Sequence, residues 1–169
     1  MSPTATEQYI DVLTGLKPGA LGLLRTHASR RPDESVDAFD LFTGLWWPVR
    51  KKNPRAPRRE VAWLIAKVYA FCPVPHSGGE TLASQLRWCQ PGQEEARKRF
   101  QQKFDQMLLL PLDHMESALR WALALIASSR RKLDWVRLTD DLSIWERECT
   151  RLRWAQEFLG KGKGGSHAY

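Results

Sequence analysis

The sequence has few of the features that mark a disulfide scaffold or a membrane span. Its three cysteines, Cys72, Cys89 and Cys149, are an odd number without a CxxC pair, which argues against a disulfide framework and a zinc knuckle. The longest apolar passage, Met107 to Leu112, is too short to cross a membrane. The first residues include acids and no apolar segment typical of a secretory signal. These absences predict a soluble, cytoplasmic protein.

Catalytic and metal-binding motifs are missing as well. The four histidines are isolated, and no HExxH, GxSxG, P-loop or glycine-rich dinucleotide motif occurs. The acidic pairs Asp140–Asp141 and Glu146/Glu148 are the best candidates for two-metal chemistry. Adjacent helical residues diverge by about 100°, however, and neither pair has a supporting histidine or third carboxylate. We therefore expect no enzyme activity, no metal and no cofactor, and a metal-dependent nuclease is the less favoured alternative.

Sustained period-two alternation is absent, and helical periodicity dominates. The sequence predicts an all-α fold, a compact helical bundle of about eight to nine helices that can divide into two small subdomains. The best candidate boundary between them is the 73–79 turn, which includes a hinge-like Ser-Gly-Gly at 77–79, and a weaker alternative lies at 91–92. The expected parts are an N-terminal helical part (1–76), a C-terminal helical bundle (77–160) and a disordered tail (161–169).

Local signals predict several helix ends. Thr4–Glu7 and Asp113–Glu116 both have the spacing of a capping box, in which two side chains satisfy free backbone N–H groups reciprocally. Asp134 is expected to cap the helix that follows it, and Gly160 to close the last helix.

Proline and the apolar pattern predict two further features. Pro48 is expected to end a helix and to begin an irregular loop that runs to Pro57. The last helix is expected to turn one apolar stripe inward: Leu152, Ala155, Phe158 and Leu159.

Positive charge is what the sequence has in excess. Lys and Arg number 26 against 19 Asp and Glu, which gives a net charge of +7. The excess is local: residues 50–60 carry +5, 97–103 carry +4, 130–137 carry +3 and 161–163 carry +2. The rest of the chain is therefore net negative. Such clusters favour a polyanion held by its backbone, and the lack of a helix-turn-helix element favours binding independent of base sequence.

Aromatic residues beside positive charge can stack on unpaired bases. Trp46 and Trp47 stand next to the basic run 50–52, so they are the stacking candidates among the eight tryptophans. The tryptophans on apolar stripes are expected to belong to the core.

The C-terminal third resembles a known family. Residues 132–145 read KLDWVRLTDDLSIW and 151–158 read RLRWAQEF. Together they resemble the signature of the CasB family, the small subunit of the type I-E CRISPR surveillance complex (Cascade). Residues 79–86 (GETLASQL) and 97–100 (RKRF) resemble further family motifs. The chain departs from the pattern at 107–114, where an apolar insertion, Leu108–Leu112, suggests a surface for a protein neighbour.

The resemblance implies a non-catalytic, all-helical subunit of an antiviral defence complex, present in two copies. It would contact other Cascade subunits and CRISPR RNA, and help to hold target DNA and the displaced single strand in the R-loop. The residues expected to contact phosphates are Arg50, Lys51, Arg97, Lys98, Arg99, Arg130, Arg131, Lys132 and Arg137, followed by Arg25, Arg30 and Arg31. Arg151 and Arg153 are instead expected to pair with Asp140 or Glu148. The alternative is a free-standing helical DNA-binding regulator, which would bind with strong sequence preference.

Overall fold

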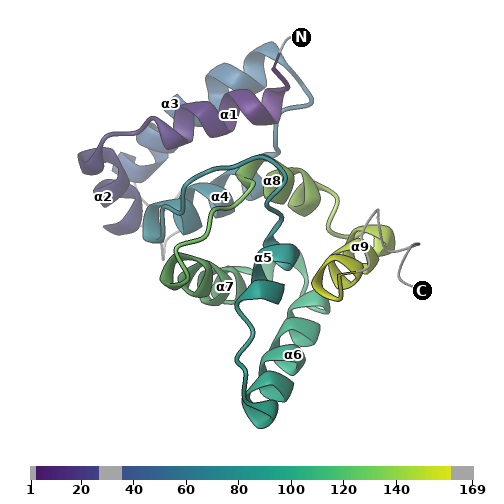
Figure 1. Cartoon of the computed structure of the whole chain (residues 1–169). Helices are drawn as coiled ribbons and strands as arrows, with labels where there is room; N and C mark the ends of the chain where they lie inside the picture. The colour runs from purple at the N-terminus through teal and green to yellow at the C-terminus, as the bar shows by residue number, and fades with distance from the viewer. Residues whose placement is uncertain (1–2, 27–35, 161–169) are drawn as a thin grey trace. The chain divides into compact units, whose positions relative to one another are not determined.

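A computed structural model describes residues 3–26 and 36–160 of the chain, with side chains from residue 40 onward in the second range. Its regular structure in those ranges is helical, which confirms the all-α prediction (Figure 1). The helices are α1 (Ala5–Thr14), α2 (Pro18–Thr26), α3 (Val36–Lys52), α4 (Arg59–Phe71), α5 (Leu82–Trp88), α6 (Glu94–Leu108), the 3₁₀ turn η1 (Leu112–His114), α7 (Glu116–Ser128), α8 (Trp135–Ser143) and α9 (Glu148–Phe158). No helix in the described part is long and apolar enough to cross a membrane. The predicted tail, 161–169, lies outside the described residues.

The chain forms two compact units, Met1–Pro73 and Val74–Tyr169. In the first unit, α1 packs on α3, and α2 packs on α3 and α4. The predicted capping box at the start of α1 is present, with the Glu7 N–H donating to Thr4 Oγ1 at 3.1 Å. The buried Tyr9 hydroxyl donates to the carbonyl of Ala62 at 2.6 Å, which ties α1 to α4.

The prediction that Pro48 ends a helix is wrong, because α3 continues through it to Lys52. Contacts on both sides of the proline hold this last turn. The Trp46 indole N–H donates to the carbonyl of Pro57 at 2.6 Å, and Val49 is buried. Arg50 Nη1 donates to the carbonyl of Ala56 at 2.8 Å. These contacts offset the backbone hydrogen bond that proline cannot donate, so the irregular segment is shorter than predicted.

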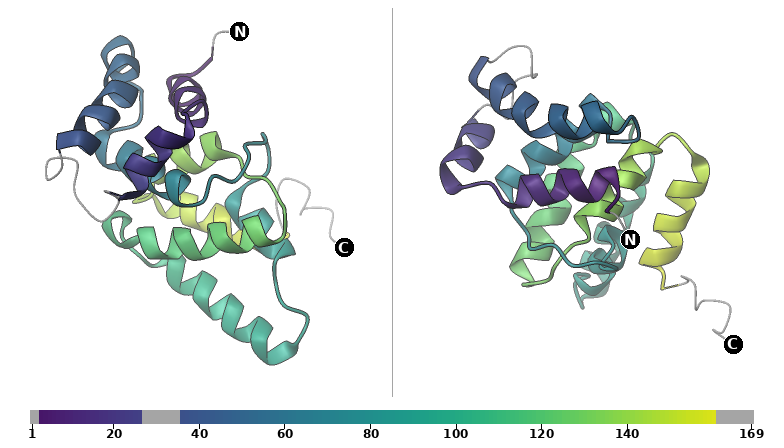
Figure 2. Two further views of the ribbon diagram at one scale, coloured as in Figure 1. Left: turned by 90° about the vertical axis from the view of Figure 1, so that its left-hand side faces the viewer. Right: turned by 90° about the horizontal axis from the view of Figure 1, so that it is seen from above.

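The second unit is built around aromatic side chains. Here α5 packs on α7 and α9, and α6 packs on α9. The rings of Phe104 and Phe158 stack with centroids 4.1 Å apart, and those of Trp145 and Trp154 meet edge to face at 4.8 Å. The loop after α5 runs outward to the start of α6, and α6 runs back from there toward the start of α7 (Figure 2).

The chain beside the hinge-like turn at 77–79 is hydrogen-bonded to the segment before α8. His76 and Leu133 form an isolated parallel bridge, in which the Ser77 N–H donates to Leu133 O at 3.0 Å. The Gly79 N–H donates to Asp134 Oδ2 at 2.8 Å. The predicted capping role of Asp134 is also confirmed, since its Oδ1 accepts from the Arg137 N–H at 2.9 Å. We call residues 133–135, which are bonded to residues 75–80, the 133–135 strap; it fixes where the chain leaves the basic residues 130–132.

For the later helices, one prediction is wrong and another is wrong in part. Asp113 does not cap α7: residues 112–114 form the 3₁₀ turn instead, and Met115 is the N-cap without a side-chain bond. In α9 the predicted stripe is correct for Phe158, which is buried with Thr150 and Trp154, but wrong for Leu152 and Leu159, which are 57% and 59% exposed. The closing role of Gly160 is confirmed by its left-handed φ of 77°.

Candidate nucleic-acid interface

The end of α7 places Arg130 in a conformation that glycine normally takes. Its φ is 54°, and its N–H donates to Ala127 O while the next N–H, of Arg131, donates to Ile126 O, both at 3.0 Å. This is the Schellman pattern, with an arginine where the left-handed residue stands. A side chain in that region costs about 1–2 kcal/mol. The strain is a reason to look for a role of the exposed guanidinium beyond folding.

A buried side chain, Gln85, holds Arg131 in place. The Arg131 Nε donates to Gln85 Oε1 at 2.7 Å, and Gln85 is buried and bonded in turn to Glu80. The same guanidinium lies over the indole ring of Trp88, 5.5 Å from the ring centroid. A buried amide thus orients this arginine, so little side-chain entropy remains to be lost when it binds an anion.

Trp88 and Arg87, at the end of α5, belong to the same surface. Trp88 is 65% exposed, and the guanidinium of Arg87 lies 5.7 Å from its ring centroid. A Cβ placed on Gly160 would come within 2.6 Å of the Arg87 guanidinium carbon, so the glycine leaves room for that group. Neither residue was predicted. The sequence does indicate an exposed Trp88, because this residue falls outside the apolar stripe of Leu82 and Leu86. The approach of Arg87 and Trp88 to Arg131, however, depends on tertiary packing.

The remaining predicted residues of this segment, Lys132 and Arg137, are both exposed, but Arg137 lies near an acid. Lys132 is exposed directly beside Arg131. Arg137 is exposed on α8, and its Nε lies 3.5 Å from Asp141 Oδ1. We call the group formed by Arg87, Trp88, Arg130, Arg131 and Lys132 the arginine–tryptophan platform.

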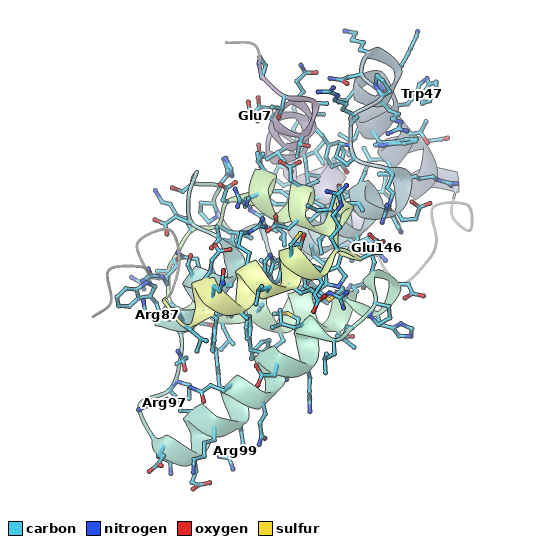
Figure 3. The ribbon with its side chains drawn as sticks, turned by 90° about the vertical axis from the view of Figure 1, so that its right-hand side faces the viewer. Glu7, Trp47, Arg87, Arg97, Arg99 and Glu146 are labelled. Carbon is cyan, nitrogen blue, oxygen red and sulfur yellow. The ribbon has the colours of Figure 1, made fainter. Side chains whose placement is uncertain are left out.

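The second predicted cluster surrounds the first turns of α6 (Figure 3). Arg97 folds back on the preceding loop, where Nη2 donates to Gly92 O at 2.7 Å. Lys98 lies 3.7 Å from Glu94 in an exposed pair, which contributes little to stability. Arg99 is exposed. All three remain able to face a polyanion.

In the first unit the predicted residues lie on different helices. Lys51 is exposed at the end of α3, next to the half-buried Arg50. Arg25 of α2 donates from Nε to the carbonyl of Ala70 at 3.1 Å, so part of its role is to bond the end of α4. Arg30 and Arg31 lie outside the described residues.

The two tryptophans predicted to stack on bases differ. Trp46 is half-buried, packs parallel to Phe42 at 5.9 Å, and uses its indole N–H within the fold. Trp47 is 50% exposed and keeps an accessible ring; Figure 3 labels its position.

The acidic residues weighed for a nuclease have a structural use. Asp141 is buried, pairs with Arg153 and accepts from the Trp154 indole N–H at 2.8 Å. Arg153 was expected to pair with Asp140 or Glu148, but its partners are Asp141 and Glu157. Burial lowers the pKa of Arg153, but the hydrogen bond and charge of Asp141, with Glu157, outweigh it and leave the pKa raised. Within 3–26 and 36–160, no three His, Cys, Asp or Glu residues gather as a metal site would require.

The apolar insertion leaves one leucine in water. Leu109, at the C-cap of α6, is 79% exposed, whereas Leu108, Leu110 and Leu112 are half-buried. The Leu110 carbonyl accepts from the Trp145 indole N–H at 2.8 Å, which holds the insertion against the core.

Comparison with known proteins gives one consistent result. Residues 20–159 match the family described as CRISPR-associated protein Cse2. A CRISPR-associated protein Cse2 from Thermus thermophilus is 36% identical over 117 residues, which cover 66% of this chain and 63% of that protein, so less than two thirds of the relative is matched. The crystal structure of CasB from Thermus thermophilus superposes with a TM-score of 0.71 at 27% identity, over 95% of this chain and 99% of that one. The structure of M. ruber CasB, at 20% identity, shares the fold with a TM-score of 0.74 over 99% of both chains.

Proposed function

The chain belongs to the CRISPR-associated Cse2 family, which includes the CasB proteins, and from this premise we propose that it is a non-catalytic small subunit of the type I-E complex Cascade. In that complex it binds nucleic acid through the sugar–phosphate backbone and stabilises the R-loop. Its partners are the other Cascade subunits, CRISPR RNA, target DNA and the displaced strand, and it is present in two copies.

The observation that carries the proposal is the arginine–tryptophan platform. Three consecutive cations, Arg130 to Lys132, follow the end of α7. The 133–135 strap holds the backbone that follows them, and Gln85 holds the guanidinium of Arg131. Fixed guanidinium groups suit phosphate, which they can contact with two N–H groups at once. Base pairing with the guide supplies sequence specificity in such complexes, so the protein needs only shape and backbone attraction.

The absence of catalysis is part of the proposal. Asp141, the most constrained of the acids considered for metal chemistry, has both carboxylate oxygens engaged by Arg153 and Trp154. A carboxylate used in this way has less capacity to ligate a metal ion.

The decisive experiment is copurification of the full chain with the remaining Cascade subunits and guide RNA, followed by a subunit count. We expect two copies per complex, and tighter binding of target DNA by the complex that contains the chain. A complex that assembles and binds target equally well without the chain would contradict the proposal.

Binding by the isolated protein separates the subunit from a free-standing regulator. We expect weak binding that falls steeply with salt and differs little among DNA sequences, because phosphates provide the attraction. Tight binding to one sequence would favour the regulator.

A further inference from the structure

We propose that Trp88 is a stacking site for one unpaired base, with the guanidinium groups of Arg87 and Arg131 holding the adjoining phosphates. This inference rests on the proposed function, because it adds a contact to a base at a surface proposed to bind the backbone. The ligand class is single-stranded nucleic acid.

The fold does not need the Trp88 indole. The buried residues of α5 are Leu82, Ala83, Gln85 and Leu86, whereas Trp88 is 65% exposed. Because it is not part of the core, replacing it should leave the helix and its packing intact. An indole kept in water beside positive charge fits a stacking platform, since aromatic rings in basic grooves are how proteins hold single strands.

The two arginines are placed for phosphate rather than for the fold alone. Their guanidinium carbons lie 5.7 Å (Arg87) and 5.5 Å (Arg131) from the Trp88 ring centroid, within cation–π range. Arg131 is also held from a second side by the Gln85 amide at 2.7 Å, whereas Arg87 occupies the space that a Cβ on Gly160 would fill. Figure 3 shows Arg87 beside the end of α9. Two cations therefore lie over an exposed aromatic ring, and one of them, Arg131, is held in a preset position.

A protein partner could also cover an exposed indole, but the charge favours nucleic acid. Arg130, Arg131 and Lys132 follow one another without an intervening acid, and Arg87 adds a fourth cation. A phosphate–base–phosphate unit satisfies both the cations and the ring. Because every base has an aromatic face, this contact would not select sequence, in keeping with the proposed function.

The test compares two single strands of equal length and charge, oligo(dT) and an abasic strand, for binding to the full chain by fluorescence anisotropy. We expect the wild-type protein to bind oligo(dT) more tightly. Trp88→Ala should weaken oligo(dT) binding about 5- to 150-fold, the range that loss of one stacked base implies, and leave abasic binding unchanged. Trp88→Phe should retain most of the affinity, and Arg131→Gln should weaken binding to both strands.

Leu152→Ala is the matched control, because it removes another exposed apolar side chain of the same unit. It should bind both strands as the wild type does. If wild-type protein binds both strands equally and Trp88→Ala changes neither affinity, stacking is overturned while backbone binding stands. If wild-type protein binds neither strand, the proposed function fails, and the stacking site with it. If Trp88→Ala binds oligo(dT) normally but no longer copurifies with Cascade subunits, Trp88 is a protein contact and the inference is wrong.

Discussion

The indole N–H of Trp154 donates a hydrogen bond to the carboxylate of Asp141 at 2.8 Å, and both residues are buried in the second unit. The other carboxylate oxygen pairs with Arg153. One acid thus joins α8 to α9 through a neutral and a charged donor. A buried carboxylate is tolerated only when it is paired in this way.

Removing this carboxylate should destabilise the protein. We expect Asp141→Ala to lower the free energy of unfolding by about 3 kcal/mol, the lower end for breaking a buried pair, because the Arg153 side chain is 32% exposed and can regain water. Urea unfolding followed by circular dichroism measures the change. Asp105→Ala, an exposed acid on α6, is the control and should change stability by less than about 0.5 kcal/mol.

The nuclease alternative makes the opposite forecast for the same variant. A metal-binding acid could be replaced with little loss of stability and would abolish Mg²⁺-dependent cleavage of single-stranded DNA. A stable Asp141→Ala protein, combined with wild-type cleavage that the variant lacks, would therefore overturn the non-enzyme proposal.

A buried tyrosine should make the first unit sensitive to alkaline pH. Burial raises the pKa of Tyr9 well above its ordinary value of 10.0, so the folded protein keeps a proton that the unfolded chain loses above about pH 10. The stability that this group contributes is complete below that pH and falls above it by about 1.4 kcal/mol per pH unit. Unfolding free energies measured between about pH 8 and 11 should show the decline.

Tyr9→Phe supplies the comparison for this pH effect. The variant loses the hydrogen bond to Ala62 and is less stable at neutral pH by about 1 kcal/mol. Its decline above pH 10 should be shallower. Some slope remains, because burial also raises the pKa of Tyr69. Identical slopes in the two proteins would show that Tyr9 does not carry the effect.

Local sequence patterns predicted the helices well, but they did not predict correctly which face of every helix is buried. In α9 two apolar faces compete: one contains Leu152 and Leu159, the other Trp154 and Phe158. Periodicity alone does not separate them. The second face is buried because the Trp154 indole N–H reaches Asp141, a partner from another helix. Pro48 is a similar case, since the contacts that continue α3 come from residues 56 and 57.

The sequence predicted those residues of the site that are neighbours along the chain. The basic runs are visible as charge, so Arg130, Arg131 and Lys132 were among the candidates. Their neighbour Trp88 was not, because it comes near Arg131 only through the packing of α5 on α7. No short-range signal reports such an approach. Trp46 shows the converse, because a tryptophan beside basic residues is half-buried and bonded within its own unit.

Neutralising the basic run should reduce the salt dependence of DNA binding. We expect Arg130→Gln, Arg131→Gln and Lys132→Gln together to lower the slope of log K against log salt by roughly 0.7–0.9 per lost phosphate contact. Anisotropy titrations across a salt series measure it. An unchanged slope would mean that this run serves solubility or docking.

The exposed leucine of the insertion should matter for assembly and not for folding. Leu109→Lys places a cation at a helix C-terminus, where it is tolerated, so the unfolding midpoint should change little. Copurification with other Cascade subunits should decrease, because an exposed apolar side chain would be lost from the proposed protein contact. Leu159→Lys is the matched control, being an exposed leucine at the C-cap of α9. Equal copurification of both variants would remove the insertion from the interface.

Replacing Arg130 with glycine should raise the stability of the protein and weaken its binding to DNA. The left-handed φ of 54° at this position favours glycine, so Arg130→Gly should raise the free energy of unfolding by about 1 kcal/mol. The same change removes one exposed cation, so DNA affinity and the salt slope should both fall. Arg130→Lys keeps both the charge and the strain, and should match the wild type in stability and slope. A glycine variant that gains stability and binds DNA as before would show that the strained arginine has no part in the interface. A variant that gains stability but loses DNA affinity would explain why a strained residue stands at the end of α7.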